Sequence, residues 1–274
     1  MASIDLNSDV GESYGRYQLG DDAAVLDHVS SANVACGMHA GDPSTIATTV
    51  GLALARGVAI GAHPGFADLQ GFGRRPMQLA PDALYHLVLY QIGALQAFCT
   101  AAGTRLAHVK AHGALYNMAV RDSAMAHAIC CAVRAVDARL IFYGLAGSEL
   151  VRTARAAGLT VAEEVFADRS YQDDGSLTPR TDPRAMITDI QQSVEQVLRM
   201  VRSGLVRSVH GVDVPVRPDT LCIHGDQPGA AQFAQAIRAA LEAEGIAIAP
   251  ITRPNGSPNS GPLADPHRRA AATP

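Results

Sequence analysis

The chain contains almost no lysine. It carries 22 basic side chains among 274 residues, and every one except Lys110 is an arginine. Charged residues make up only 18% of the sequence, and the formal net charge is −4. This balance is ordinary for a globular protein, and it leaves no strongly basic surface that would attract nucleic acid. We therefore expect no nucleic-acid partner.

Long apolar runs are missing as well. The apolar segments are too short and too often interrupted by charge to cross a bilayer. The first residues, "SIDLNSDV", read as a strand and lack the basic-then-apolar start of a secretory signal. These features predict a cytoplasmic protein without a membrane partner.

Cysteine is scarce and irregularly spaced. The five cysteines form no C-x-x-C pair, which argues against a zinc knuckle or a thioredoxin-type site. Cys36, at the end of an apolar run, is placed where a nucleophile could lie. Nothing in the sequence shows a neighbour that would activate its thiol, so a catalytic cysteine is not favoured.

What the sequence does have is a repeated unit: a short apolar run, a polar cluster rich in Gly, His or Asp, and then an amphipathic helix. Strands that alternate with helices in this way predict a parallel sheet. Seven such runs are enough to close a barrel, so we expect an α/β fold, a (β/α) barrel of about seven parallel strands. The expected strands are 4–6, 32–35, 58–60, 107–109, 140–143, 160–165 and 220–223.

The helices between these strands complete one domain. We assign residues 1–251 to a single catalytic barrel and expect the Pro-, Gly- and Ser-rich residues 252–274 to form a disordered tail. The segment 172–183, "QDDGSLTPRTDP", reads as a lid or a partner-binding loop. The expected helices are 22–31, 43–56, 81–102, 123–136, 148–157, 183–202 and 229–244.

Polar clusters follow the strands, where α/β folds build their sites. The first, "NSDVGES", offers Asn7, Asp9 and Glu12, whose carboxylates could bind a metal, act as a base or cap a turn. The second, "CGMHAGDP", offers His39 and Asp42. Asp42 precedes a proline, so a helix cap explains it as well as a ligand role does. His39 lies in a loop flanked by glycines, and this position favours a functional role for it over a core one.

The third cluster resembles an anion-binding loop. "GAHPGFADLQGFGRRPM" begins with His63 and ends with Arg74 and Arg75. Backbone amides made accessible by glycine, together with two guanidinium groups, suit a carboxylate or a phosphate. The arrangement matches neither a Walker A nor a dinucleotide-binding motif.

The fourth cluster contains the single lysine. In "LAHVKAHGALYN", His108, Lys110 and His112 alternate along a strand and should share one face, either inside the barrel or against the helices. An indifferent surface cation in this chain would be an arginine. Lysine offers a compact charge and a nitrogen that can lose its proton, which favours a functional Lys110. We expect the same of His112, whereas His108 fits a core position equally well.

The last two strands end in polar residues too. "EEVFADRSY" supplies Glu164, Asp168 and Arg169, and "CIHGDQPGA" supplies His224 and Asp226, the latter also explicable as a helix cap. Six strand ends therefore carry His, Lys or carboxylate groups. Because these ends meet at one rim of a barrel, their convergence predicts a single active site.

The long motifs resemble a known family. In order and at matching spacing the chain contains "DLNSDVGE", "SANVACGMHAGDP", "GAHPGFADLQGFGRRPM", "YQIGAL", "HVKAHGALYN", "EVFADRSY" and "CIHGDQPGA". Together they resemble the LamB/YcsF family over about residues 4–250. Two positions depart from the pattern: Ala111, where proline commonly follows the lysine, and Ser8, where cysteine is common.

The resemblance implies both a fold and an activity. It implies a barrel of fewer than eight strands, similar to glycoside hydrolase and polysaccharide-deacetylase barrels. Family members are described as one of three subunits of a bacterial 5-oxoprolinase, which opens 5-oxoproline to L-glutamate with hydrolysis of ATP. The resemblance thus implies ATP as cofactor, and the other two subunits, B and C, as partners. On general grounds, we expect Mg²⁺ to accompany the ATP. Because the chain has no P-loop, ATP would bind in another manner or on another subunit.

These implications suggest roles for the candidate residues. Lys110 would hold the carbonyl or phosphoryl oxygen, Asp9 or Glu164 would be the base, and His112 would assist proton transfer. The arginines would bind carboxylate or phosphate, and the other residues would shape the pocket. This substrate- and phosphate-binding set is Asn7, His39, His63, Arg74, Arg75, Arg169 and His224.

Two other functions stay open at this point. A stand-alone metal-dependent amide hydrolase or deacetylase could use Asp9, His39 and His63 as ligands, although no H-x-x-x-H pair is present. A non-catalytic subunit that binds a small acid and presents it to partners is the second alternative.

Overall fold

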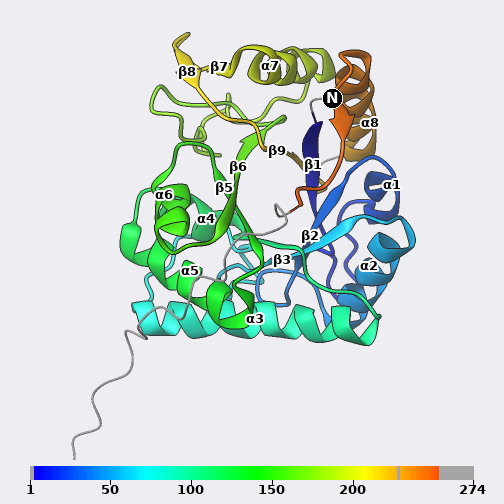
Figure 1. Ribbon diagram of the computed structural model, residues 1–274, viewed down its shortest axis with the longest axis vertical. Helices are drawn as coiled ribbons and strands as arrows, with labels where there is room; N and C mark the ends of the chain where they lie inside the picture. The colour runs from blue at the N-terminus through cyan, green and yellow to red at the C-terminus, as the bar shows by residue number, and fades with distance from the viewer. Residues whose placement is uncertain (1–2, 227–228, 253–274) are drawn as a thin grey trace, which may run out of the picture.

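Seven parallel strands form a closed barrel, as the repeated pattern predicts (Figure 1). The computed structural model describes residues 3–226 and 229–252. Hydrogen-bonded neighbours run β1-β2-β3-β4-β5-β6-β9, and β9 pairs with β1 to close the ring. The barrel strands are β1 (Ser3–Val10), β2 (Ser31–Ala35), β3 (Ala59–His63), β4 (His108–Lys110), β5 (Ile141–Leu145), β6 (Thr160–Phe166) and β9 (Thr220–His224).

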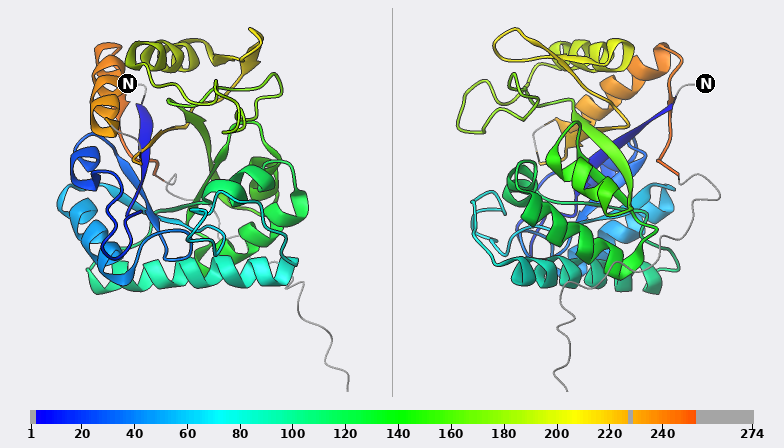
Figure 2. Two further views of the ribbon diagram at one scale, coloured as in Figure 1. Left: turned by 180° about the vertical axis from the view of Figure 1, so that it is seen from behind. Right: turned by 60° about the vertical axis from the view of Figure 1, so that its left-hand side comes forward.

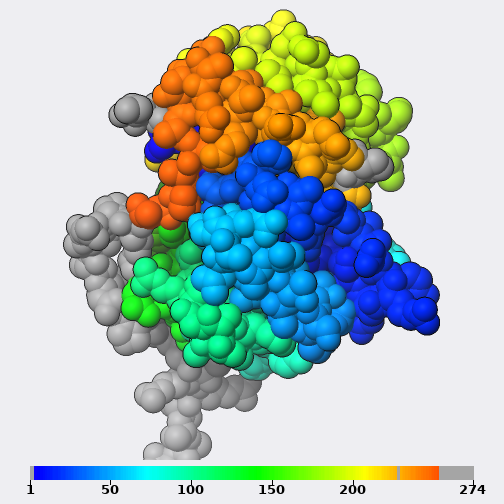
Figure 3. Space-filling view, turned by 90° about the vertical axis from the view of Figure 1, so that its right-hand side faces the viewer, coloured from blue at the N-terminus to red at the C-terminus, as the bar shows by residue number. Residues whose placement is uncertain are grey.

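Helices surround the barrel, as the two views in Figure 2 show. The long α3 runs along one side and packs against α5, while α1, α2 and α8 lie side by side on the face in Figure 3. No helix among residues 3–226 and 229–252 is both long and apolar enough to cross a membrane. The helices are α1 (Asp22–Leu26), α2 (Pro43–Ala55), α3 (Pro81–Ala101), α4 (Gly113–Ala119), α5 (Ser123–Asp137), α6 (Glu149–Ala156), α7 (Ile190–Ser203) and α8 (Ala230–Ala243).

Capping residues set several helix boundaries. Asp42 accepts hydrogen bonds from the Ser44 and Thr45 amides, and Pro43 occupies the first turn of α2, so the cap interpretation of Asp42 is confirmed. Asp189 caps α7 in the same manner. This cap places the start of α7 at Ile190, later than the predicted residue 183.

The inside of the barrel is polar. On β1, Ile4, Leu6 and Val10 belong to the main hydrophobic core, whereas Asp5, Asn7 and Asp9 make side-chain hydrogen bonds within the ring of strands. The apolar core lies mainly between the strands and the helices. The second apolar cluster is small, formed by three buried residues of β5 and β6: Ile141, Tyr143 and Ala162.

Several predicted boundaries were wrong. The first strand continues through Val10 rather than ending at Leu6, because its inward positions are polar and still belong to the sheet. The short helix α4, which begins at Gly113 after Lys110, was not among the expected helices.

Strands outside the barrel were not predicted. Leu205–Arg207 (β7) and Asp213–Pro215 (β8) form an antiparallel hairpin, and Ala247–Ile248 (β10) pairs with β1. The predicted disordered tail, apart from its first residue, lies outside the described residues.

Candidate active site

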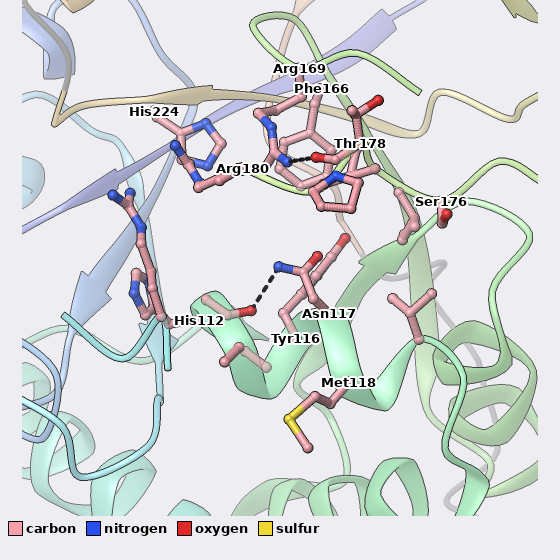
Figure 4. Close-up of a pocket in the computed structure, with 18 of the residues that line it drawn as sticks. His112, Tyr116, Asn117, Met118, Phe166, Arg169, Ser176, Thr178, Arg180 and His224 are labelled. Carbon is pink, nitrogen blue, oxygen red and sulfur yellow. Dashed lines mark hydrogen bonds between the residues drawn. The ribbon is translucent and has the colours of Figure 1, made fainter. Parts of the chain in front are cut away.

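A pocket of about 760 Å³ opens at the carboxyl ends of the barrel strands. In Figure 4, α4 with Tyr116 and Asn117 faces Arg169, Thr178 and His224 across the opening. The segment 176–181, part of the predicted lid or partner loop, also lines it. The pocket size is typical of small-molecule sites. Sequence-predicted residues that line the pocket are Asp9, His63, Arg74, Lys110, His112, Arg169 and His224.

Lys110 projects into the barrel and is surrounded by acceptors. Its Nζ lies 2.7 Å from Glu164 Oε1, 2.9 Å from Asp9 Oδ1, 3.0 Å from Cys222 Sγ and 3.3 Å from Asn7 Oδ1. Only 2% of the residue is exposed. Burial opposes the charge, but the Asp9 carboxylate, with Cys222 and Glu164, raises the pKa of the Lys110 ammonium well above its usual value. Lys110 is therefore a fixed cation rather than a base.

An interior hydrogen-bond network orients the two carboxylates. Asn33 donates to Asn7 Oδ1 at 2.7 Å and to Asp9 Oδ1 at 2.8 Å. Asn7 donates in turn to Glu164 Oε1 at 3.2 Å, and the Tyr116 hydroxyl donates to Glu164 Oε2 at 2.7 Å. Glu164 thus has a donor on each oxygen, and Asp9 keeps Oδ2 free of these bonds.

Asp9 Oδ2 points to a histidine cluster. It lies 3.2 Å from His63 Nε2, which is 3.0 Å from His112 Nδ1. Burial raises the pKa of Asp9, but His63 and Lys110 outweigh it and hold the value well below its usual range. His39 stacks on His112 with ring centroids 3.7 Å apart. Asp9, His63 and His112 therefore form a contiguous polar wall.

Glu12 completes the cluster. Its Oε1 lies 3.5 Å from His112 Nδ1 and 3.6 Å from His39 Nε2. Burial raises the pKa of Glu12 well above its usual value and lowers the pKa of His39 and His112. Burial therefore disfavours the charged form of each of these three groups.

Two glycines permit this close packing. A Cβ on Gly65 would lie 2.6 Å from His39 Nδ1, and one on Gly73 would lie 2.7 Å from His39 Cβ. Gln91 of α3 fixes the loop by accepting from the Gly65 amide at 2.9 Å and donating to its carbonyl at 2.8 Å. The glycines of this loop therefore make room for the ring and Cβ of His39 in the cluster.

The two neighbouring arginines, Arg74 and Arg75, lie in different places. Arg74 lines the pocket, pairs with Asp226 at 2.6 Å and lies over the Phe72 ring. Arg75 pairs with Asp68 and has a largely exposed side chain away from the pocket wall. The cap interpretation of Asp226 was wrong, because the N-cap position of α8 is Gly229.

The far wall comes from the ends of β6 and β9. His224 Nδ1 lies 2.8 Å from Asp168 Oδ2. Arg169 donates to the Thr178 carbonyl at 2.6 Å and so anchors the loop that covers the pocket. Burial lowers the pKa of Arg169 to about 10. Arg169, which was predicted to bind an anion, therefore also holds this loop in place.

Some important residues were missed from sequence. Asn33 stands in the middle of an apolar strand, and that exception could have indicated an interior site. Cys222 and Tyr116 gave no comparable signal. His108 proves to be interior, where its Nε2 donates a hydrogen bond to Asn33 Oδ1 at 2.7 Å. Cys36 is buried, and desolvation raises the pKa of its thiol to about 12, so it is no activated nucleophile.

The fold and the site define a class: a (β/α)₇ barrel with a buried lysine, two carboxylates and a histidine cluster beside a pocket. The chain matches the LamB/YcsF family over residues 4–256. It belongs to that family, as its motifs predict.

Two relatives and one solved structure are similar along nearly their whole length. A protein of Bordetella pertussis (strain Tohama I), named as the A subunit of 5-oxoprolinase, is 62% identical over 246 residues, covering 90% of this chain and 98% of that protein. One of the same name from Brevibacillus brevis (strain 47) is 59% identical over 249 residues, covering 91% and 98%. The crystal structure of a lactam utilization protein from Thermus thermophilus has a TM-score of 0.85 at 50% identity, covering 90% and 99%.

Proposed function

We propose that this chain is the barrel subunit of a 5-oxoprolinase, which opens 5-oxoproline to L-glutamate with hydrolysis of ATP to ADP and phosphate. The observation that carries this proposal is the 62% identity, over 90% of the chain, to a protein named as the A subunit of 5-oxoprolinase. The pocket adjoining Lys110 supplies a place for the chemistry.

The lactam needs activation before water can open it. Transfer of the γ-phosphoryl group of ATP to the lactam oxygen releases ADP and makes the ring carbon electrophilic. One water then adds to this carbon, the ring C–N bond breaks, and the nitrogen leaves as the amine of an acyl phosphate. A second water hydrolyses the acyl phosphate to glutamate and phosphate. This route requires a cation near the oxygen and a base near the water.

In this proposal, these tasks fall to different residues. Lys110 is the cation at the pocket floor, and it also holds Asp9 and Glu164. Asp9 is the better base of the two predicted carboxylates, because its Oδ2 faces His63 while both Glu164 oxygens accept hydrogen bonds. His63 and His112 line the pocket beside this carboxylate.

Anions would bind at the opposite wall. Arg74, Arg169 and His224 line the pocket and suit the substrate carboxylate or the phosphoryl group. Arg180 lines it too and joins this set as a residue that the sequence did not single out. Arg75 is left out, because its side chain points away from the pocket wall toward Asp68.

Subunits B and C complete the enzyme in this proposal. They supply what a chain without a P-loop lacks for binding ATP, and Mg²⁺ accompanies the nucleotide. Location in the cytoplasm suits this chemistry, since ATP is available there.

An add-back assay tests the function. Extract of the native host lacking this chain is supplied with the purified protein, 5-oxoproline and ATP, and glutamate is followed. We expect glutamate only when both the chain and ATP are added. Glutamate formed with the chain but without ATP would favour a metal-dependent amide hydrolase instead. No glutamate in extract that contains subunits B and C would contradict the proposal.

A further inference from the structure

Two ring nitrogens in the histidine cluster face each other with no hydrogen between them. His63 Nδ1 lies 2.8 Å from the Lys110 carbonyl, and His112 Nε2 lies 2.8 Å from the Phe72 carbonyl. A carbonyl oxygen only accepts, so each of these nitrogens carries its proton. In neutral rings, His63 Nε2 and His112 Nδ1 therefore both present lone pairs, and they lie 3.0 Å apart.

A carboxylate oxygen joins these two lone pairs. Glu12 Oε1 lies 3.5 Å from His112 Nδ1 and has no hydrogen-bond partner among the described residues. The three residues are buried, with 7%, 1% and 3% exposure for Glu12, His63 and His112. Buried polar atoms without partners cost free energy, so three electron-pair donors converging here call for a cation.

We propose that Glu12, His63 and His112 bind a divalent first-row transition-metal ion, of which Zn²⁺ is the representative. Two imidazole nitrogens with one carboxylate oxygen suit such an ion better than Mg²⁺, which prefers oxygen ligands. Bonds of about 2.1 Å would set ligand atoms roughly 3–3.5 Å apart. The observed separations of 3.0 and 3.5 Å agree with this requirement.

The surroundings of the two histidines have the form expected of metal ligands. A ligating histidine usually donates its other N–H to a carbonyl or carboxylate, which fixes its tautomer. Lys110 and Phe72 provide such carbonyls here. Phe72 is in the left-handed region at φ 54, a conformation uncommon for a bulky residue, and it directs this carbonyl to His112.

His39 is a neighbour of the ion rather than a ligand. A metal lies close to the plane of each imidazole that binds it. The rings of His39 and His112 are stacked 3.7 Å apart with an interplanar angle of 4°, so an ion in the plane of His112 would lie well outside the plane of His39. By contrast, His63 and His112 are inclined at 86° and can share an ion. His39 Nε2, 3.6 Å from Glu12 Oε1, would orient the carboxylate.

The site faces the substrate pocket. His63 and His112 both line the pocket, and Asp9 Oδ2 lies 3.2 Å from His63 Nε2. Three protein ligands with one side open to a pocket is the arrangement of catalytic rather than structural zinc sites. The ion would be held by this chain alone, so the inference goes beyond the proposed lactam opening and stands apart from ATP and from the partner subunits.

A proton is the competing occupant of this space. A doubly protonated His63 would donate to the Lys110 carbonyl and to Asp9 or His112. That arrangement leaves Glu12 Oε1 and both ring nitrogens of His39 without partners, as they are now. An ion bound to Glu12 removes the first of these deficits, which is why the geometry favours the metal.

Metal binding to the purified full-length chain tests the proposal. Metal content is measured by mass spectrometry as isolated and after chelation. The stripped protein is then titrated with Zn²⁺ by calorimetry and with Co²⁺ by visible absorption. We expect one equivalent per chain, with a Co²⁺ spectrum of a nitrogen- and oxygen-ligated site. E12Q and H112A should weaken binding roughly 100-fold or more, beyond what loss of an outer contact causes.

The control is H86A, which removes an exposed histidine of α3. It should bind like the wild type, and circular dichroism should show all variants folded. The site would be overturned if the wild type bound less than one equivalent of metal, or if E12Q and H112A bound metal as tightly as the wild type. Either result would leave a proton as the occupant. Failure of oxoprolinase activity in a chain that binds its ion would count against the function and not against the site.

Discussion

Lys110 lies between two buried carboxylates, and its positive charge compensates theirs inside the barrel. Asp9 and Glu164 bind the same ammonium at 2.9 and 2.7 Å. Arginine would not serve here, because its planar fork is larger than the compact ammonium that fits among these acceptors. A chain that otherwise uses arginine keeps its one lysine at this position for a physical reason.

Replacing Lys110 separates its structural and chemical effects. K110M leaves two unpaired carboxylates in the interior and should cost about 3–5 kcal/mol of unfolding free energy. K110M/E164Q removes one of these charges and should recover part of that loss while remaining without oxoprolinase activity. Urea unfolding and glutamate formation measure the two quantities.

The matched control removes a cation that has no buried carboxylates around it in the part of the chain that the structure describes. Arg139 is 71% exposed in its side chain and pairs only locally with Asp137 in the described contacts. R139M should keep both stability and activity within error. Near-normal turnover in a folded K110M/E164Q would show that the reaction does not need the cation at this position.

At the level of the elements, neighbouring strands approach closely where glycine allows it. Gly61 of β3 pairs with His108 of β4, and a Cβ on Gly61 would overlap the His108 ring. This ring in turn binds Asn33, which orients Asp9. One glycine therefore influences the position of the base through two intermediate side chains.

A pair of alanine substitutions tests this packing. G61A should destabilise the protein by about 1–3 kcal/mol, since the ring must move within a closely packed interior. G51A, in the interior of α2 with no heavy atom within 4 Å of the new Cβ, should instead stabilise it by about 0.5–1 kcal/mol. Unfolding free energies from urea titration give both values. Equal effects of the two substitutions would refute the packing explanation.

The cap of α2 predicts a pH dependence. Thr45 and Gly15 donate to Asp42 and lower the pKa of its carboxyl to about 2. Since the pKa of an unfolded aspartate is about 3.9, this contribution to stability is complete above that value and is lost as the pH falls toward 2.

D42N isolates the contribution, because asparagine can still cap the helix but does not titrate. The wild type should be more stable than D42N at pH 7, and the difference should shrink as the pH falls from about 4 toward 2. Urea midpoints across this range measure it. A difference that is the same at every pH would contradict the assigned cause.

For the whole molecule, the sequence predicted the barrel better than its interior. Seven apolar runs separated by amphipathic helices were enough to predict seven parallel strands. The reason is that the apolar residues of each strand pack against the apolar faces of the helices around the barrel. The polar inner face of β1 misled the same rule, which takes Asn7 and Asp9 as the end of a strand. The short α4 was missed because it starts at a glycine directly after β4.

The convergence of the strand ends was predictable, but the pairing of side chains was not. Strand register decides that Asp9 lies beside Asn33 and His224, and no local pattern encodes that register. Arg75 shows the same limit: it is adjacent to Arg74 in sequence, yet it binds Asp68 instead of facing the pocket. Roles inferred from chemistry alone therefore need the three-dimensional arrangement.

The most direct measurement follows glutamate and phosphate together in a purified system. The chain is mixed with subunits B and C, 5-oxoproline, ATP and Mg²⁺, and each component is omitted in turn. We predict that the two products appear in equal amounts and that neither glutamate nor substrate-dependent phosphate forms without this chain. Glutamate released without ATP, or at the full rate without this chain, would contradict an ATP-coupled lactam opening at the Lys110 site.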